Sequence, residues 1–329
     1  MSHLGKLLSR SLSVPGLAPL LLRVRTSNPL ILMYHGIGGD EPPSGLNSLE
    51  AKHIPGAIFE CQLRLLERTR RVISLSDMVD GLIEQRDMRN TVAITFDDGY
   101  ENNFTRAAPL LAARGMCATF FVTTDYIGTD RWMWTDKLQA LLDCARVNEI
   151  SVPGDSQRLK LTSVQERLAA LRCLKVRLKR LAPTECEAAV AQLNDALGGI
   201  DDRPFGDHRF MDWTQVKALA DAGFEIGAHT ATHPILSRLP VDDALDEIRR
   251  SKEKVVTEVG HCSDVFCYPN GKAEDITAPI TDYCKHHFRA ALSTVRGPAR
   301  LCDLFALRRI GAPYDRRVAS LVRDLLRER

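Results

Sequence analysis

Short apolar runs alternate with longer amphipathic stretches along most of the chain. The apolar runs have the length and composition of buried strands, and they span residues 30–35, 92–96, 117–122, 265–271, 288–294 and 305–310, with a further run starting at residue 224. The amphipathic stretches repeat apolar residues at helical spacing and span residues 58–68, 76–85, 101–114, 241–259 and 316–327. Strands that alternate with helices predict an α/β fold with a parallel sheet.

Two of the apolar runs end in side chains that can carry chemistry. Asp97 and Asp98 directly follow one run, and His229 and His233 follow another. If a helical turn joins the two histidines, both imidazoles lie on one face and can reach one metal ion. One carboxylate with two imidazoles leaves coordination positions open for water and substrate.

Each of these features also has a simpler explanation. An aspartate before a helix is a common N-terminal cap, and histidine pairs at this spacing occur on solvated helices. Here, however, the pair follows a strand and has small or polar neighbours instead of an amphipathic pattern. Neighbouring carboxylates at a strand end are costly unless a positive charge holds them, so the combination favours a divalent metal site.

The segments TFDDGY and HTATHP, at 95–100 and 229–234, resemble the first two motifs of the polysaccharide deacetylase family, also called carbohydrate esterase family 4. The resemblance covers roughly residues 30–310. It implies a distorted (β/α) barrel with about seven strands, a divalent metal, for which we expect Zn²⁺, and hydrolysis of N-acetyl groups on aminosugars. Carried over to this chain, it implies a general base and three metal ligands, namely Asp97 and then Asp98, His229 and His233.

The segment at 265–271 resembles the family's third motif, which helps to line the active-site groove. Family members often carry an arginine there that orients the catalytic aspartate, and Cys267 stands at about that place in this chain. We expect Tyr268, Pro269 and Asn270 to line the substrate site. A peptide NH of this segment could polarise the acetyl carbonyl.

The resemblance leaves the general acid unassigned. Family members usually supply it as a histidine near the C-terminus, but the last histidine, His287, precedes the strand at 288–294 and so lies at the wrong end of the barrel. His35 ends its own apolar run in the same direction as Asp97. We therefore expect His35 to line the site, where it assists protonation of the leaving amine or binds substrate. The alternative is that it bonds only to a neighbouring loop.

Residues 129–212 interrupt the alternation of strands and helices and predict an inserted helical subdomain. The predicted organisation is a leader segment at 1–28 and a barrel domain at 29–329 that the insertion interrupts. We expect Trp134, which lies in an aromatic cluster, to contact substrate. The expected helices of the insertion span residues 136–146, 162–181 and 184–197.

The helix expected at 162–181 carries a stripe of leucines surrounded by basic side chains, and the stripe consists of Leu168, Leu171, Leu174, Leu178 and Leu181. One interpretation is a solvated helix that packs on the barrel by its leucines. The other is a basic amphipathic helix that lies on anionic lipid.

The amino-acid composition restricts the expected cellular location of the protein and its expected binding partners. The net charge of +2 and the lack of a nucleic-acid motif disfavour nucleic acid as a partner. Nine cysteines without a CxxC pair fit reduced thiols and hence the cytoplasm. The leader at 1–28 has no clear cleavage site, so we expect it to pack on the domain or to lie on the inner face of the membrane as a peripheral contact. The sequence indicates no oligomeric state.

These features predict a metal-dependent hydrolase that removes N-acetyl groups from an aminosugar-containing polysaccharide or glycan precursor. Two alternatives remain open: an amide hydrolase of the same fold that acts on a small molecule, and an inactive metal-binding module that recognises glycans, which the altered third motif suggests. A groove open at both ends would favour a polymer, whereas a site closed by the insertion would favour a small molecule.

Overall fold

The computed structural model describes residues 28–39, 45–48, 52–313 and 319–327. The leader segment expected at 1–28 therefore falls outside the described residues, except for its last position.

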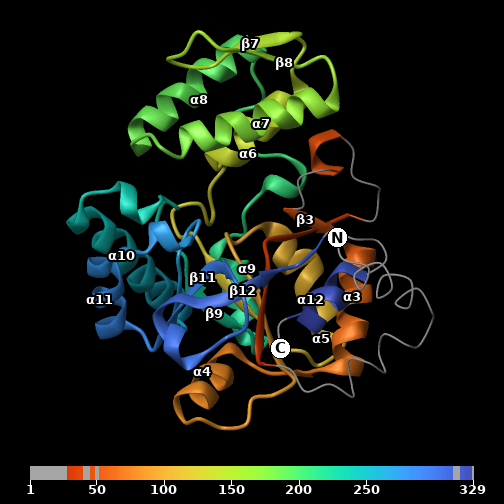
Figure 1. The fold of residues 1–329 in the computed structure, drawn as a ribbon, viewed down its shortest axis with the longest axis vertical. Coiled ribbons are helices and arrows are strands. Elements are labelled where there is room, and N and C mark those ends of the chain that lie inside the picture. Colours follow the sequence, from red (N-terminus) through yellow and green to blue (C-terminus); the bar gives the residue numbers. More distant parts are fainter. Residues whose placement is uncertain (1–27, 40–44, 49–51, 314–318, 328–329) are drawn as a thin grey trace.

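A nearly closed barrel of parallel strands forms the centre of the molecule (Figure 1). Seven strands follow one another around it in the order β10-β11-β12-β1-β5-β6-β9. They are β1 (Leu30–Tyr34), β5 (Thr91–Phe96), β6 (Thr119–Val122), β9 (Glu225–Ala228), β10 (Val265–Cys267), β11 (Ala290–Arg296) and β12 (Leu307–Gly311). A two-residue strand, β4 (Arg71–Val72), pairs with β5 outside this path. The predicted distorted (β/α) barrel with about seven strands is confirmed.

Burial on both faces explains why the strands read as continuous apolar runs. Every residue of β5 is buried. On the face of the strands that packs against the helices, Phe96 stacks on Tyr34 and on Phe120, with ring centroids 5.2 and 4.9 Å apart. Because all seven strands run parallel, their carboxyl ends share one edge of the barrel, and loops at that edge can converge on one site.

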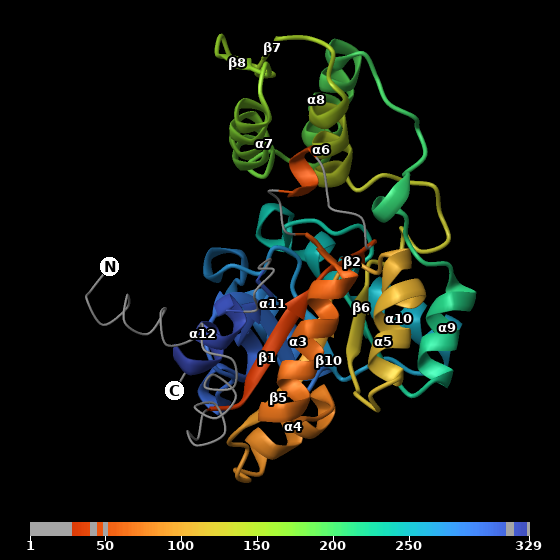
Figure 2. The ribbon, with the colours of Figure 1, turned by 90° about the vertical axis from the view of Figure 1, so that its right-hand side faces the viewer.

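Helices cover the outside of the barrel, as the amphipathic stretches predict (Figures 1 and 2). They are α3 (Gly56–Thr69), α4 (Leu75–Ile83), α5 (Ala108–Ala112), α9 (Trp213–Asp221), α10 (Val241–Val259), α11 (Ala278–His287) and α12 (Ala319–Arg327). The stretch expected as one helix at 101–114 is divided into a π-helical segment, η2 (Asn103–Ala107), and α5, because Pro109 has no amide hydrogen to continue the ladder.

Between β6 and α9 the chain leaves the barrel and forms a helical cap, coloured green in Figures 1 and 2. The cap consists of α6 (Trp134–Cys144), α7 (Val164–Leu178), α8 (Pro183–Leu197) and a hairpin of β7 (Glu149–Ser151) with β8 (Arg158–Lys160), which the sequence did not predict. The leucines of α7 pack in a core shared with α6 and α8. The expectation that they pack on the barrel is therefore wrong, and their burial leaves no leucine stripe for lipid.

Short elements complete the fold. They are β2 (Gly36–Gly38), which pairs with β3 (His53–Pro55), and the 3₁₀ turns η1 (Gly45–Ser48), η3 (Gly206–His208), η4 (Leu236–Arg238), η5 (Ala273–Asp275) and η6 (Leu301–Ala306). Within the described ranges, every helix is too short or too polar to cross a bilayer.

Candidate active site

The turn after β5 places two carboxylates at the carboxyl edge of the barrel. The Asp97 amide donates to the Tyr34 carbonyl at 2.9 Å and so extends the pairing of β5 with β1. Asp98 and Gly99 then adopt positive φ values of 74° and 91°. At Gly99 a Cβ would lie 2.9 Å from a side-chain carbon of Ile127, so this turn requires glycine. A positive φ at Asp98 is a strained conformation of the kind that occurs at functional sites.

The loop after β9 brings the two histidines together without a helical turn. The His229 amide donates to the Val122 carbonyl at 3.1 Å, which fixes it at the end of the strand pair. Thr230 and His233 then have positive φ values of 65° and 61°, which exclude a right-handed helix. The predicted helical turn is therefore wrong, although the two imidazole centroids do lie 5.0 Å apart.

Three side-chain atoms of this site face one another. Oδ1 of Asp98 lies 3.5 Å from Nε2 of His229 and 3.3 Å from Nε2 of His233. This oxygen is buried and has no hydrogen-bond partner among the described residues. The other ring nitrogen of His229, Nδ1, lies 2.7 Å from the Cys267 carbonyl, which leaves Nε2 pointed at the carboxylate. An unsatisfied buried oxygen beside two imidazole nitrogens fits a divalent cation.

A half-buried lysine that no sequence motif indicated holds the outer oxygen of Asp98. Nζ of Lys52 lies 3.3 Å from Oδ2 of Asp98 and 2.8 Å from Oδ1 of Asp136, a residue of α6. The Tyr100 hydroxyl donates to the other oxygen of Asp136 at 2.6 Å. Burial raises the pKa of Asp98, but Lys52 and the two histidines outweigh burial and hold that pKa well below its usual range.

An arginine from β12 holds the second carboxylate. The Arg309 guanidinium donates to both oxygens of Asp97, at 2.7 and 2.8 Å, and is fully enclosed. Burial raises the pKa of Asp97, and the charge and hydrogen bonds of Arg309 bring it below the ordinary value. The Cys267 thiol also lies 3.5 Å from Oδ1 of Asp97. The aspartate thus has an arginine partner, although it comes from β12 and not from the third motif.

The sequence contained a weak signal for Arg309. It stands between Leu307 and Ile310 in an apolar run, where an unpaired guanidinium would be too costly to bury. Such an arginine needs a buried acid as its partner, but sequence alone does not say which one.

A cavity of about 390 Å³, which we call the strand-end pocket, is lined by Lys52, Asp97, Asp98, His229 and His233. Of the residues expected to bind substrate, His35, Tyr268 and Asn270 line it. Burial lowers the pKa of His35, and the charges of Asp98 and Asp97 oppose this shift.

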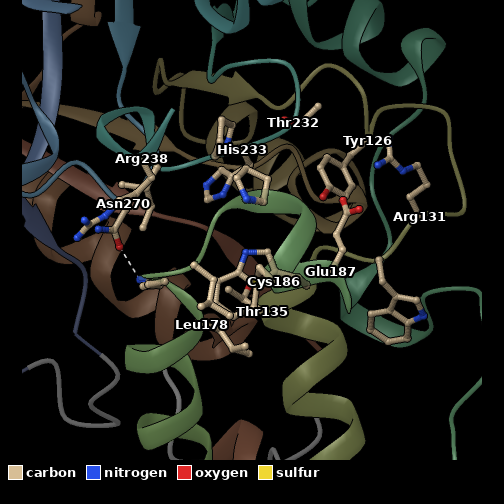
Figure 3. Close-up of a pocket in the computed structure, with 17 residues that line it drawn as sticks. Tyr126, Arg131, Thr135, Leu178, Cys186, Glu187, Thr232, His233, Arg238 and Asn270 are labelled. Carbon is tan, nitrogen blue, oxygen red and sulfur yellow. Dashed lines mark hydrogen bonds between the residues drawn. The ribbon is translucent and has the colours of Figure 1, made fainter. Parts of the chain in front are cut away.

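A second cavity of about 240 Å³ lies between the helical cap and the barrel, and we call it the cap pocket (Figure 3). Trp134 lines the cap pocket, as expected for a substrate contact. The two pockets adjoin one another, because they share Thr135, Lys179, His233 and Asn270. Pro269 is buried and, within the described part of the chain, lines neither pocket.

The segment at 265–271 directs fewer peptide NH groups at a substrate than the sequence suggests. The amides of Tyr268 and Gly271 donate to the carbonyls of Leu292 and Pro269, so neither is directed at a substrate. The Tyr268 hydroxyl donates to the Phe305 carbonyl at 3.1 Å. This segment therefore shapes the pocket, and two of the three peptide NH groups from Tyr268 to Gly271 are already used within the fold.

Comparison with known proteins identifies a family that matches this chain. The polysaccharide deacetylase sequence profile matches residues 84–288. The putative polysaccharide deacetylase YxkH of Bacillus subtilis is 31% identical over 124 residues, which are 36% of this chain and 41% of that protein. The match thus spans about two fifths of the relative's length.

Two solved structures share the fold at low identity. Streptococcus pyogenes deacetylase PplD, in complex with acetate, has a TM-score of 0.59 and 16% identity, covering 92% of this chain and 99% of that one. IcaB from Ammonifex degensii has a TM-score of 0.58 and 17% identity, covering 90% and 97%. The motifs, the barrel and a profile match over more than half of the sequence lead to one conclusion: the chain belongs to the polysaccharide deacetylase family.

Proposed function

We propose that this protein is a metal-dependent hydrolase that removes N-acetyl groups from an aminosugar-containing polysaccharide or glycan precursor. The observation that carries the proposal is the convergence of Asp98, His229 and His233 beside Asp97 in one pocket. Family membership supports a deacetylase acting on a glycan.

In this proposal Asp98, His229 and His233 hold the metal, for which Zn²⁺ suits two imidazoles and a carboxylate. When bound, a divalent ion of this kind acidifies water and polarises a carbonyl. The hydrogen bond from His229 to the Cys267 carbonyl orients its ring for that role. Lys52 does the same for the carboxylate, since it holds Oδ2 while Oδ1 faces the histidines.

Asp97 acts as the general base that takes a proton from the attacking water. Arg309 keeps this carboxylate ionised and fixed, because it binds both oxygens. The adjacent positions of Asp97 and Asp98 on a sharp turn let one acid bind metal while its neighbour faces the water.

The leaving amine needs a proton, and His35 is the candidate of this chain for that step. It lines the strand-end pocket within range of the charges of Asp97 and Asp98. His35→Ala should lose turnover while metal content and melting temperature stay at the wild-type values. Unchanged turnover would leave His35 as a residue that only bonds to a neighbouring loop.

Two structural observations separate the proposal from its alternatives. The inactive-module hypothesis depended on the missing arginine of the third motif, and Arg309 supplies that arginine from β12. The cap pocket continues the strand-end pocket past His233 and is lined by Trp132 and Trp134. Aromatic rings in a continuing pocket favour a glycan with sugars beyond the acetylated one over a small amide.

The deciding experiment is an acetate-release screen over acetylated aminosugars of increasing length, with protein reconstituted with Zn²⁺ and with other divalent ions. The proposal expects metal-dependent acetate release that increases with glycan length. Release only from small non-sugar amides would favour the small-molecule alternative. Glycan binding without acetate release would favour the recognition module.

A further inference from the structure

Lysine side chains from the helical cap face the strand-end pocket. Lys175 and Lys179 lie in the last turn of α7 and at its C-terminal cap, and both line this pocket. Lys179 also lines the cap pocket, so it stands where the two cavities meet. Its ammonium group donates to the side-chain oxygen of Asn270, a neutral acceptor (Figure 3).

The carboxylates of the strand-end pocket already have cationic partners. Within the described lining of this pocket, the acidic residues are Asp97 and Asp98. Arg309 binds Asp97 through two hydrogen bonds, and Lys52 lies against Asp98. The end of the cap that carries Lys175 and Lys179 therefore faces a cavity in which both carboxylates already have a cationic partner.

Positive charge is crowded around Lys179. Burial lowers the pKa of Lys179, and the charges of Lys175 and Lys272 lower it further, while Asp275 opposes them. Arg238, at the end of η4 on the barrel side, lines the cap pocket together with Lys179. A half-buried ammonium group among other cations is stabilised when an anion binds near it.

Helix geometry alone does not account for this arrangement. Lysines in a last turn stabilise the negative end of a helix dipole. Arg180, the next residue, is exposed and could serve that purpose from solvent. Lys179 instead directs its ammonium group across the pocket to Asn270 on the barrel.

We propose that Lys175 and Lys179 of the cap, with Arg238 of the barrel, bind an oxyanion carried by the substrate next to its acetamido sugar. The substrate class is thus an acetylated aminosugar that bears a phosphate or a carboxylate near the scissile N-acetyl group. This inference rests on the proposed function and specifies its substrate. Both oxyanions satisfy the same cations, because lysine binds each as a compact point charge.

Binding to the full-length Asp97→Asn protein, reconstituted with metal, tests the site without turnover. Calorimetry compares N-acetylglucosamine 1-phosphate, a disaccharide of N-acetylglucosamine with glucuronic acid, and neutral di-N-acetylchitobiose. We expect at least one anionic probe to bind about tenfold or more tightly than the neutral one, and that probe identifies the oxyanion. Equal affinity for all three probes would overturn the inference.

Matched variants in the same background assign the preference to these side chains. Lys179→Gln, and independently Arg238→Gln on the exposed barrel side, should each reduce the ratio of anionic to neutral affinity by about tenfold. Arg180→Gln removes an adjacent positive charge outside both pockets and should keep the ratio. The proposed site is contradicted if the ratio of anionic to neutral affinity is unchanged in both pocket variants. It is also contradicted if Arg180→Gln lowers that ratio as much as they do.

Acetate release by the wild-type protein separates this inference from the proposed function. Release from neutral and anionic probes at equal kcat/KM would leave the deacetylase proposal standing and would overturn the anionic preference. Preferential binding of an anionic probe, with no acetate released from any aminosugar, would support the anion site and count against deacetylation.

Discussion

Removing the arginine partner of Asp97 tests the central pair of the site. Arg309 donates to both carboxylate oxygens, at 2.7 and 2.8 Å, inside the barrel. Arg309→Met keeps much of the side-chain length but leaves the carboxylate buried without its countercharge. Breaking a buried pair in this way costs about 3–5 kcal/mol of unfolding free energy. Removing both charges in Asp97→Asn/Arg309→Met leaves no orphaned ion, so the double variant should be more stable than the single one.

The same substitution changes the titration of Asp97, the proposed general base. Arg309 holds the pKa of Asp97 below its ordinary value against the opposing effect of burial. Without the arginine, burial dominates and the pKa rises above the ordinary value. The carboxylate is then protonated at higher pH, so the acid limb of the kcat/KM profile should move to higher pH.

The measurements are urea denaturation of the wild type and the two variants, and the pH profile of acetate release by the wild type and Arg309→Met. A rescue experiment combines Cys267→Arg with Arg309→Met, because the Cys267 thiol lies 3.5 Å from Oδ1 of Asp97. This change moves the arginine to about the place where relatives carry it, and it should recover part of the activity. Two results would refute the reasoning: equal stability of the single and double variants, and an acid limb that does not move.

Three further changes test other parts of the site. Asp97→Asn should retain metal and lose about 10²- to 10⁴-fold in turnover, because an amide cannot accept the proton of water; activity within a few-fold of wild type would make Asp97 structural. His229→Ala should bind no metal ion in metal analysis. One bound ion per chain in this variant would show that His229 is not a metal ligand. Burial lowers the pKa of His53 to about 3, so the unfolded chain binds a proton that the folded one rejects, and stability falls as pH drops from about 6.5 toward 3. In urea denaturation, His53→Gln should weaken the dependence of the unfolding free energy on pH between pH 7 and pH 5. An unchanged dependence would contradict a lowered pKa of His53.

Local patterns were enough to predict an α/β fold with a parallel sheet and the polar residues at its strand ends, whereas the barrel was implied by the family resemblance. The apolar run that ends before Asp97 and Asp98 predicts a buried strand followed by a polar turn. The hydrophobic pattern and the TFDDGY motif therefore indicate the same local structure. The convergence of His229 and His233 was also predicted, although through a helical turn. The structure uses positive φ values at Thr230 and His233 instead, and side-chain spacing does not reveal backbone handedness at such positions.

The missed residues act through contacts between segments that are far apart in the sequence. Arg309 is 212 positions from Asp97, and Lys52 is 84 positions from Asp136. In both cases the sequence shows a polar residue that needs a partner, but the fold decides which partner it meets. For Arg309 the order of the strands decides, and for Lys52 the position of α6 of the cap decides. The cap shows the same limit, because the leucine stripe of α7 predicts a buried face without saying whether the barrel or α6 and α8 will cover it.

The position of Arg309 on β12 links activity to the order in which the chain is made. β12 is the last of the seven barrel strands in sequence, and it lies between β11 and β1. A nascent chain that has reached β11 already contains Asp97, Asp98 and both histidines, but Asp97 meets its arginine partner only when β12 takes its place. The surroundings that the structure gives Asp97 are therefore complete only when the last barrel strand is in place.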